Sequence, residues 1–318
     1  LKEARAKKHQ TDWKTVDVAA PSRTGIFEIP VKVEEILDYI DWSPFFWAWE
    51  LKGLYPKIFE NPKYGDEARK LYEDGQKLIK QALREKRFFP RSLVGIFPAA
   101  SDGDDIEIYD PLRKDLLKKF YFLRQQRKKD AVSGTHYCLS DFVAPKTAGR
   151  EDYLGAFVVT AGPEVEKWAR EFEKENDDYS SILVKAIGDR MAEGLAELTH
   201  KKAREIFGFG QRENLSNADL IAEKYRGIRP APGYPACPDH TTKFALWELM
   251  DIGNRLDVHL TESAAMTPPS SVSGFYFTHP EAKYFHVGKI DRDQLQDMAQ
   301  RRNLELSYLE KWLAPQLV

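Results

Sequence analysis

The sequence is poor in cysteine, in long apolar runs and in any surplus of charge of one sign. Its two cysteines, Cys138 and Cys237, fit no metal-ligand or redox spacing, so we expect two free thiols. Lysine and arginine total 48 against 50 acidic residues, and the net charge of −2 favours no nucleic-acid partner. No apolar run approaches the roughly 18 residues of a membrane span, and no signal peptide opens the chain. We therefore expect a soluble, cytoplasmic protein that binds no membrane.

Several catalytic motifs are also missing. The chain has no Gly-x-Gly-x-x-Gly after a strand, no phosphate loop, no His-Glu-x-x-His and no Gly-x-Ser-x-Gly. The sequence therefore gives no support for binding of a dinucleotide or a nucleoside triphosphate, or for a zinc protease or serine hydrolase. The seven histidines are scattered without ligand spacing, so we predict no metal site and no catalytic residue. The residues alone permit a ligand-binding module and show no catalytic apparatus.

The composition is that of a globular protein, and the pattern at its start is helical. Hydrophobic residues make up 42% and charged residues 31% of the 318 residues, enough for a well-buried core. After a polar lead-in of residues 1–24, helical spacing and caps predict helices at 33–40, from Ser43 onward and at 66–87. The first ninety residues are thus expected to be mostly helix. Asp41 lies at the break between the first two helices, where it either caps a helix or binds a ligand.

From Ser92 the period changes to that of strands. Alternating apolar residues and a turn at Asp102-Gly103 predict an antiparallel sheet of four or five strands, followed by two more strands near the end of the chain. The expected strands are 92–98, 106–109, 119–126, 137–143, 153–160, 272–278 and 283–290. The pattern of 119–126 also fits a helix, but its aromatic residues favour a strand.

Helical patterns return after this sheet. The expected helices are 164–174, 180–207, 217–225, 239–251, 292–302 and 307–312. The longest carries an apolar stripe that we expect to pack on the sheet, and on another face it aligns Asp189, Glu193 and Glu197 at i, i+4, i+8. A charged helical row is usually solvated, yet three acids in a row repel by a few tenths of a kcal/mol.

The stretch from Gly227 to Pro238 stands out by its four prolines at 230, 232, 235 and 238. Proline fixes φ and removes a backbone donor, so the segment is expected to be stiff and extended, with outward carbonyls. Arg229 offers a fork of donors for a carboxylate or phosphate, Gly233 permits positive φ, and Tyr234 offers an aromatic face. The segment is either a structural loop or a grip for a ligand with an anionic end, a planar ring and a cationic centre.

A family resemblance decides between these readings. The segment Arg229-Pro-Ala-Pro-Gly-Tyr234, with Tyr39-Ile-Asp-Trp-Ser-Pro, Cys138-Leu-Ser-Asp-Phe-Val-Ala-Pro, Leu260-Thr-Glu-Ser and Val272-Ser-Gly-Phe-Tyr-Phe-Thr-His-Pro, closely resembles the C-terminal activation domain of cobalamin-dependent methionine synthase. The likeness covers almost the whole chain. It implies an α+β fold: a C-shaped single domain with a twisted antiparallel sheet flanked by helices and a helical N-terminal part. Residues 1–24 would link it to a preceding cobalamin-binding domain, and residues 25–318 would form the activation domain, with a helical subregion at about 30–90.

The same resemblance implies a function and a site. The domain would bind S-adenosylmethionine and supply its methyl group for reductive methylation of cob(II)alamin to methylcobalamin, as a module of 5-methyltetrahydrofolate–homocysteine methyltransferase. Arg229 would pair with the ligand carboxylate, Asp41 with its ammonium group, and Glu193 would place negative charge near the cation. Ala231, Gly233, Tyr234, Tyr284 and Phe285 would hold the adenosine part.

The implied cofactors and partners follow from the family. Cobalamin would be held by the neighbouring domain, because this chain lacks the Asp-x-His-x-x-Gly pattern of the lower cobalt ligand. Zinc would lie only elsewhere in the full enzyme, so the isolated fragment is not expected to turn over. The electron donor would be a flavoprotein, either a diflavin methionine synthase reductase or flavodoxin. An alternative function is a docking module for that reductase with the ligand as allosteric signal, using the basic stretches 124–129 and 201–204.

Overall fold

The computed structural model describes residues 1–128, 131 and 134–318 of the chain. Lys129, part of one basic stretch considered above, lies outside the described residues. The strands are β1 (Gly25–Glu28), β2 (Arg91–Asp102), β3 (Asp105–Tyr109), β4 (Leu116–Tyr121), β5 (Asp152–Thr160), β6 (His259–Leu260), β7 (Met266–Thr267) and β8 (Ser271–Tyr276). The helices are α1 (Lys2–Ala6), α2 (Val33–Leu37), α3 (Ser43–Trp47), α4 (Gly65–Glu85), α5 (Glu164–Lys174), α6 (Asp178–Ile206), α7 (Asn217–Ile221), α8 (Thr242–Met250), α9 (Ile252–Leu256), α10 (Arg292–Arg302) and α11 (Leu306–Leu313).

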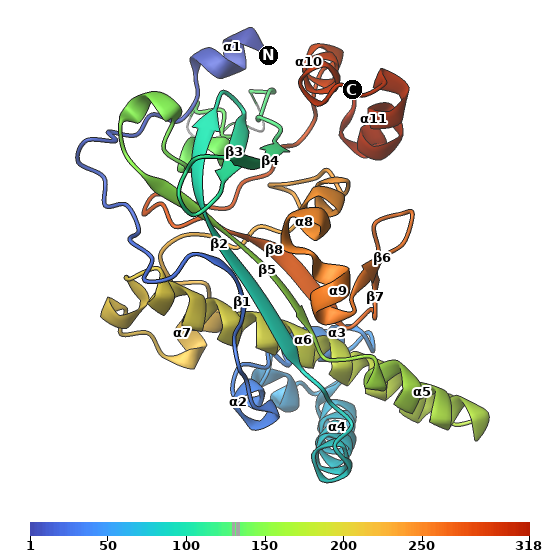
Figure 1. The fold of residues 1–318 in the computed structure, drawn as a ribbon. Coiled ribbons are helices and arrows are strands. Elements are labelled where there is room, and N and C mark those ends of the chain that lie inside the picture. The colour runs from blue at the N-terminus through green and yellow to red at the C-terminus, as the bar shows by residue number, and fades with distance from the viewer. Residues whose placement is uncertain (129–130, 132–133) are drawn as a thin grey trace.

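A six-stranded antiparallel sheet forms the centre of the molecule (Figure 1). Its main path runs β4-β3-β2-β5-β8, and β1 pairs with β2 off that path. The long strand β2 is buried on both faces, so its alternate residues enter two cores. Val94 and Ile96 pack with α4 and α6, whereas Leu93 and Phe97 pack with α8 and the C-terminal helices. The predicted sheet and the packing of the longest helix on it are confirmed.

The N-terminal part contains less helix than the sequence pattern predicts. Before residue 90, only α4 is longer than five residues. Prolines at 30, 44, 56 and 62 interrupt the region, and proline removes a helix hydrogen bond wherever it enters an interior turn. The expectation that the first ninety residues are mostly helix was therefore wrong, although the helices beginning at Val33 and Ser43 are present.

Two predicted strands are absent from the described residues. The segment 137–143 contains the 3₁₀ helix η2 (Leu139–Phe142), where the Asp141 carboxylate accepts the Cys138 N–H at 3.0 Å. The segment 283–290 runs beside the proline segment, and Val287 N donates to Pro235 O at 2.9 Å. Since prolines supply no N–H groups, that neighbour cannot form a continuous ladder.

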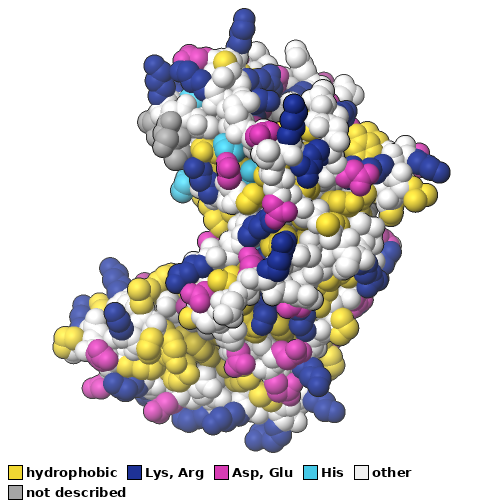
Figure 2. Space-filling view, turned by 90° about the vertical axis from the view of Figure 1, so that its left-hand side faces the viewer, with side chains coloured by type: hydrophobic (Ala, Val, Ile, Leu, Met, Phe, Trp, Pro, Cys, Tyr) yellow, Lys and Arg dark blue, Asp and Glu magenta, His cyan; other side chains and the backbone are white. Residues whose placement is uncertain are grey.

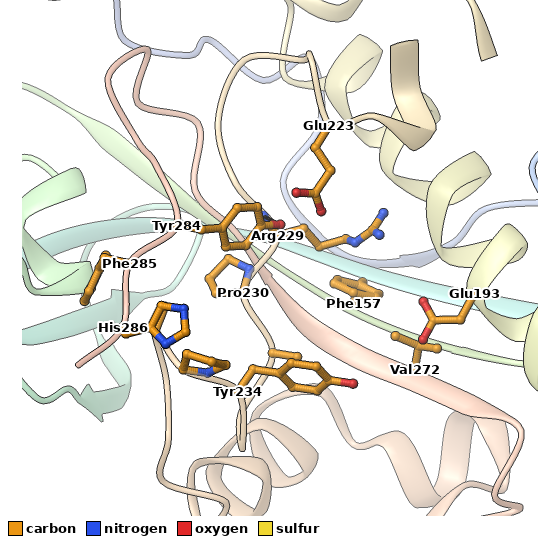
Figure 3. Close-up of a pocket in the computed structure, with 13 residues that line it drawn as sticks. Phe157, Glu193, Glu223, Arg229, Pro230, Tyr234, Val272, Tyr284, Phe285 and His286 are labelled. Atoms are coloured by element: carbon orange, nitrogen blue, oxygen red, sulfur yellow. Dashed lines mark hydrogen bonds between the residues drawn. The ribbon is translucent and has the colours of Figure 1, made fainter. Parts of the chain in front are cut away.

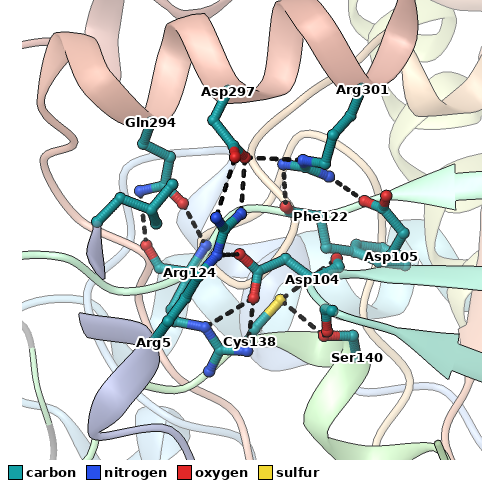
Figure 4. Close-up of polar contacts among 12 residues, drawn as sticks. Arg5, Asp104, Asp105, Phe122, Arg124, Cys138, Ser140, Gln294, Asp297 and Arg301 are labelled. Carbon is teal, nitrogen blue, oxygen red and sulfur yellow. Dashed lines mark hydrogen bonds and ion pairs between the residues drawn. The ribbon is translucent and has the colours of Figure 1, made fainter. Parts of the chain in front are cut away.

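A buried arginine network ties the sheet to both ends of the chain (Figure 4). The fully buried guanidinium of Arg124 bonds Asp104 through Nε at 2.8 Å and both oxygens of Asp141 at 2.7 and 2.8 Å. Arg5 of α1 reaches Asp104 at 2.7 Å and Asp297 of α10 at 2.7 Å. The first residues of the chain are therefore fastened to the sheet and to α10.

The outline has the C shape that the resemblance implies, with two lobes around a hollow (Figure 2). Helices α2, α3 and α4 lie at one end, and α1, α10 and α11 at the other (Figure 1). Both cysteines are free and buried, as predicted. Within the described part of the chain, no helix is both long and apolar enough to cross a membrane.

Candidate functional site

The proline segment borders a pocket of about 450 Å³ between α6, β8 and residues 284–286 (Figure 3). The pocket combines apolar walls with three charged side chains, a typical composition for a small-molecule site. It is lined by Phe157, Glu193, Glu223, Arg229, Pro230, Ala231, Tyr234, Pro235, Ala236, Val272, Tyr284, Phe285 and His286.

Backbone hydrogen bonds hold the proline segment in place. Ile228 exchanges two bonds with Phe277 at 3.0 Å each, and Phe275 N donates to Pro230 O at 3.0 Å. Further along, Gly233 N donates to Cys237 O at 2.7 Å. The segment is stiff, as predicted, but several of its carbonyls already have protein partners. The expected set of outward carbonyls is thus smaller than the sequence suggests.

Gly233 occupies a position that no other residue fits. Its φ is +98°, and a Cβ there would lie 2.2 Å from Cε1 of His240. The imidazole of His240 therefore packs against the turn that carries Tyr234. Gly233 itself lines an adjoining hollow with Pro238 and Gly288 rather than the main pocket.

Arg229 is buried with one terminal nitrogen paired. Its Nη2 donates to Glu197 on α6, and the two side chains are only 9% and 14% exposed. Among the described residues, Nη1 of Arg229 has no hydrogen-bond partner. Burial by itself lowers the pKa of the guanidinium, but the Glu197 carboxylate outweighs that effect and the net pKa is raised. A buried donor without a partner is costly, so Nη1 is suited to an anionic ligand group.

Two carboxylates face the same pocket. Burial raises the pKa of the Glu193 carboxyl, and Arg229 opposes that shift. Burial also raises the pKa of Glu223, again against Arg229, and Figure 3 shows Glu223 reaching towards the guanidinium. A cation in the pocket would stabilise both ionised forms.

Aromatic side chains complete the walls. The Tyr284 hydroxyl accepts the Arg229 backbone N–H at 3.0 Å, which joins the proline segment to residues 284–286. Tyr234 is 63% exposed and Tyr284 43% exposed, whereas Phe285 is buried. The two exposed rings leave surfaces on which a planar ligand group can stack.

The structure brings together most of the residues singled out from the sequence. Glu193, Arg229, Ala231, Tyr234, Tyr284 and Phe285 line one pocket. Asp41 is not among the lining residues, and its Oδ1 accepts the Ser43 N–H at 2.9 Å, which is the local capping contact.

Asp41 nevertheless lies close to the helix that supplies Glu193. The preceding residue, Ile40, would lie 3.4 Å from a Cβ at Gly194 of α6. The α2–α3 connection therefore packs beside the acidic face of α6.

Sequence reasoning missed several pocket residues and one of their partners. Glu223, Phe157, Val272 and His286 carry no local signal, whereas Glu197 belongs to the acidic row on α6. Only part of that row is solvated: Glu197 pairs with Arg229 and Glu193 lines the pocket, whereas Asp189 is exposed and accepts from the Ser270 hydroxyl at 3.0 Å. The repulsion among three neighbouring acidic residues without a basic partner was the sequence signal that could have identified Glu197.

The charged groups of the pocket suit an organic ligand rather than a metal ion. No group of three or more histidine, cysteine or acidic residues that could hold a metal ion occurs in residues 1–128, 131 and 134–318. One unpaired guanidinium nitrogen and two carboxylates suit a ligand bearing both a carboxylate and positive charge.

Comparison with known proteins relates this chain to a family model and to solved structures. Residues 32–303 match the family model described as "Vitamin B12 dependent methionine synthase, activation domain". A solved structure, the crystal structure of the MetH reactivation domain bound to AdoHcy, is 46% identical in sequence with a TM-score of 0.96. That match covers 100% of this chain and 98% of the other.

Proposed function

Because this chain belongs to the activation-domain family of vitamin B12-dependent methionine synthases, we propose that its pocket binds S-adenosylmethionine for reactivation of the enzyme. When bound, S-adenosylmethionine supplies a methyl group for reductive methylation of cob(II)alamin to methylcobalamin. The observation that carries this proposal is the unpartnered Nη1 of Arg229 at a pocket with two carboxylates. The relative that holds AdoHcy supports it, because AdoHcy is the same molecule without the methyl group.

Each end of the ligand has a suitable group in this chain. The carboxylate fits Arg229 Nη1, where it would satisfy a buried donor. Glu193 supplies negative charge for the sulfonium. The turn carrying Ala231, Gly233 and Tyr234 holds the adenosine part, with Tyr284 and Phe285 on the facing wall.

The ammonium group has two candidate partners. Asp41 was the partner expected from the resemblance, and Glu223 is the carboxylate that lines the pocket beside Arg229. Both are kept in the proposal, since Asp41 follows Ile40, which packs near Gly194 beside Glu193, and Glu223 lies near the guanidinium.

The chain acts within a larger enzyme in this proposal. Cobalamin is held by the neighbouring domain, to which residues 1–24 lead, and zinc belongs to another part of the enzyme. The isolated domain binds its ligand without turning over methionine. The proposed location is the cytoplasm.

A flavoprotein reductase stays a proposed partner, but the two basic stretches lose support as its docking surface. Arg124 is fully buried on Asp104 and Asp141, and Arg204 is buried with its Nε 2.8 Å from Glu213. Lys202 is paired with Glu35 at 3.3 Å. Apart from the exposed Lys128, the described cations of these stretches are largely paired within the chain and offer little to an acidic partner.

Titration calorimetry of the isolated domain with S-adenosylmethionine tests the proposed function. We expect saturable one-to-one binding and no methionine formation. Absence of binding to the folded domain would overturn the proposal. In the intact enzyme, reactivation of the cob(II)alamin form is expected to require S-adenosylmethionine together with an electron donor.

A further inference from the structure

Glu197 touches the proposed ligand site only through Arg229. It lies one helical turn after Glu193 on α6 and pairs with Nη2 of Arg229, but it does not line the pocket. The pair is almost completely buried. Glu197 is therefore placed to act on a ligand through the charge of Arg229 rather than by contact.

The charges around the pocket show what this pairing does. The charged lining residues are Arg229, Glu193 and Glu223. Two further cations lie on α6: Arg190, whose charge acts on Glu193, and Arg204, which is paired with Glu213 at 2.8 Å. With Glu197 cancelling Arg229, the two remaining lining carboxylates leave the pocket with an excess of negative charge. Without Glu197, the guanidinium would offset one of those two carboxylates, because arginine does not lose its proton in proteins, and the negative excess would fall by one charge.

We propose that Glu197 is the residue that sets the charge specificity of the pocket, and this rests on the function proposed above. By neutralising Arg229, it lets Nη1 bind a ligand carboxylate while the pocket still favours a ligand with net positive charge. The site then prefers the methyl donor, whose sulfonium makes it cationic, over the neutral thioether product. Such a preference helps a site that must load the donor while the product is also present.

Electrostatics predicts the size of the effect. S-adenosylmethionine and S-adenosylhomocysteine share the carboxylate, ammonium and adenosine groups and differ by the methyl group and one positive charge. A change of one unit of charge in a partly screened site changes the affinity ratio by about tenfold. The carboxylate contact acts on both ligands alike and cancels in that ratio.

Titration calorimetry of Glu197→Gln with three ligands tests the proposal. The ligands are S-adenosylmethionine, S-adenosylhomocysteine and sinefungin, which carries an ammonium-bearing carbon in place of the sulfonium. We expect the ratio of S-adenosylmethionine to S-adenosylhomocysteine affinity to fall about tenfold. The affinity for sinefungin relative to S-adenosylhomocysteine is expected to fall in the same way, because the site recognises the positive charge and not the sulfur atom.

Two further variants separate specificity from folding. Glu205→Gln removes the same charge from an exposed position on the same helix and is expected to leave the ratio unchanged. Glu197→Asp keeps the charge and is expected to retain the wild-type ratio within about twofold. A purely structural role of Glu197 would weaken all three ligands alike.

The outcomes distinguish this inference from the function on which it rests. If wild-type protein binds none of the three ligands, the proposed function fails. If wild-type protein binds them but Glu197→Gln leaves the ratio unchanged, only the specificity role is overturned. A fall in the ratio of S-adenosylmethionine to S-adenosylhomocysteine affinity in Glu197→Asp, where the charge is retained, would also contradict the specificity role.

Discussion

The imidazole of His240 lies so close to Gly233 that a Cβ on residue 233 would come within 2.2 Å of His240 Cε1. The contact joins the turn of the proline segment to the residues just before α8 (Thr242–Met250). It gives a physical reason for glycine between Arg229 and Tyr234: both the backbone conformation and the space exclude a side chain.

Gly233→Ala is expected to destabilise the domain and weaken ligand binding. Positive φ costs a non-glycine residue about 1 kcal/mol or more, and the clash with His240 adds to that cost. Urea unfolding checks the stability, and calorimetry checks the binding. Adding His240→Ala removes the clash but not the backbone strain, so the double variant is expected to recover only part of the loss. Full recovery would contradict the role of φ.

Arg229→Ala is expected to weaken S-adenosylmethionine binding by about 2 to 4 kcal/mol, as when one partner of a buried, hydrogen-bonded charge pair is removed. The change also leaves Glu197 without its partner. Calorimetry on protein shown to be folded by circular dichroism measures the effect. Unchanged affinity would remove Arg229 from the site.

Asp41→Asn and Glu223→Gln compare the two candidate ammonium partners. If Glu223 binds the ammonium group, Glu223→Gln is expected to reduce affinity by about 1 to 3 kcal/mol, since a charge-assisted hydrogen bond becomes a neutral one. Asp41→Asn is expected to cause a smaller loss, because its carboxylate already accepts the Ser43 N–H. Equal affinity of wild type and Asp41→Asn would leave Asp41 only its capping role.

His279 is expected to make stability fall in mild acid. Burial, with His9 and Arg226 nearby, lowers the pKa of His279 to about 4. Its Nδ1 accepts the Glu281 N–H at 3.1 Å and its Nε2 lies 3.2 Å from the Thr11 hydroxyl, so the folded state holds the neutral ring.

The direction of the pH dependence follows from the pKa of His279 in the unfolded and in the folded chain. The unfolded chain takes up a proton near pH 6.5 and the folded one only near pH 4, so stability is lost as pH falls between them. Allowing for partial solvent screening, the loss is about 2 kcal/mol. Urea unfolding from pH 7 to 4 measures it, and His279→Gln is expected to flatten the profile over this window. An unaltered profile in that variant would assign the acid sensitivity to other groups.

Arg124→Met is expected to destabilise the domain by about 3 to 5 kcal/mol, because it leaves Asp104 and Asp141 buried with less compensating charge. Arg127→Met is the matched control. Arg127 pairs with Asp291 at 2.7 Å, but these side chains are 37% and 45% exposed. The control is expected to cost less than about 1 kcal/mol. Similar losses in the two variants would refute the importance of burial.

Much of the local structure was predictable from the sequence. The helices at 164–174 and 292–302 have the predicted bounds, and Ser216 caps α7 as a serine before a helix commonly does. Apolar periodicity, caps and turns act over a few residues and are therefore visible in the chain itself. The family resemblance supplied the C shape and six of the 13 pocket residues.

The errors share a physical cause. Residues 283–290 have strand-like residues, but their neighbour in the fold is a proline segment without enough donors to form a ladder. Residues 137–143 bend into a 3₁₀ helix because the Asp141 carboxylate is needed by both Arg124 and the Cys138 N–H. In each case a distant partner overrides local propensity.

The sequence by itself determined the stiff segment with Arg229 and the uncompensated acidic row on the longest helix, whereas the need for glycine at 233 came from the fold. Only the tertiary structure decided which acid of that row meets Arg229 and which faces the pocket. Glu193 and Glu197 are one turn apart on the same helix, yet Glu197 neutralises the guanidinium while Glu193 is left for a ligand. The reason is that charge pairing depends on distance and burial, and the folded backbone sets both between residues far apart in the chain.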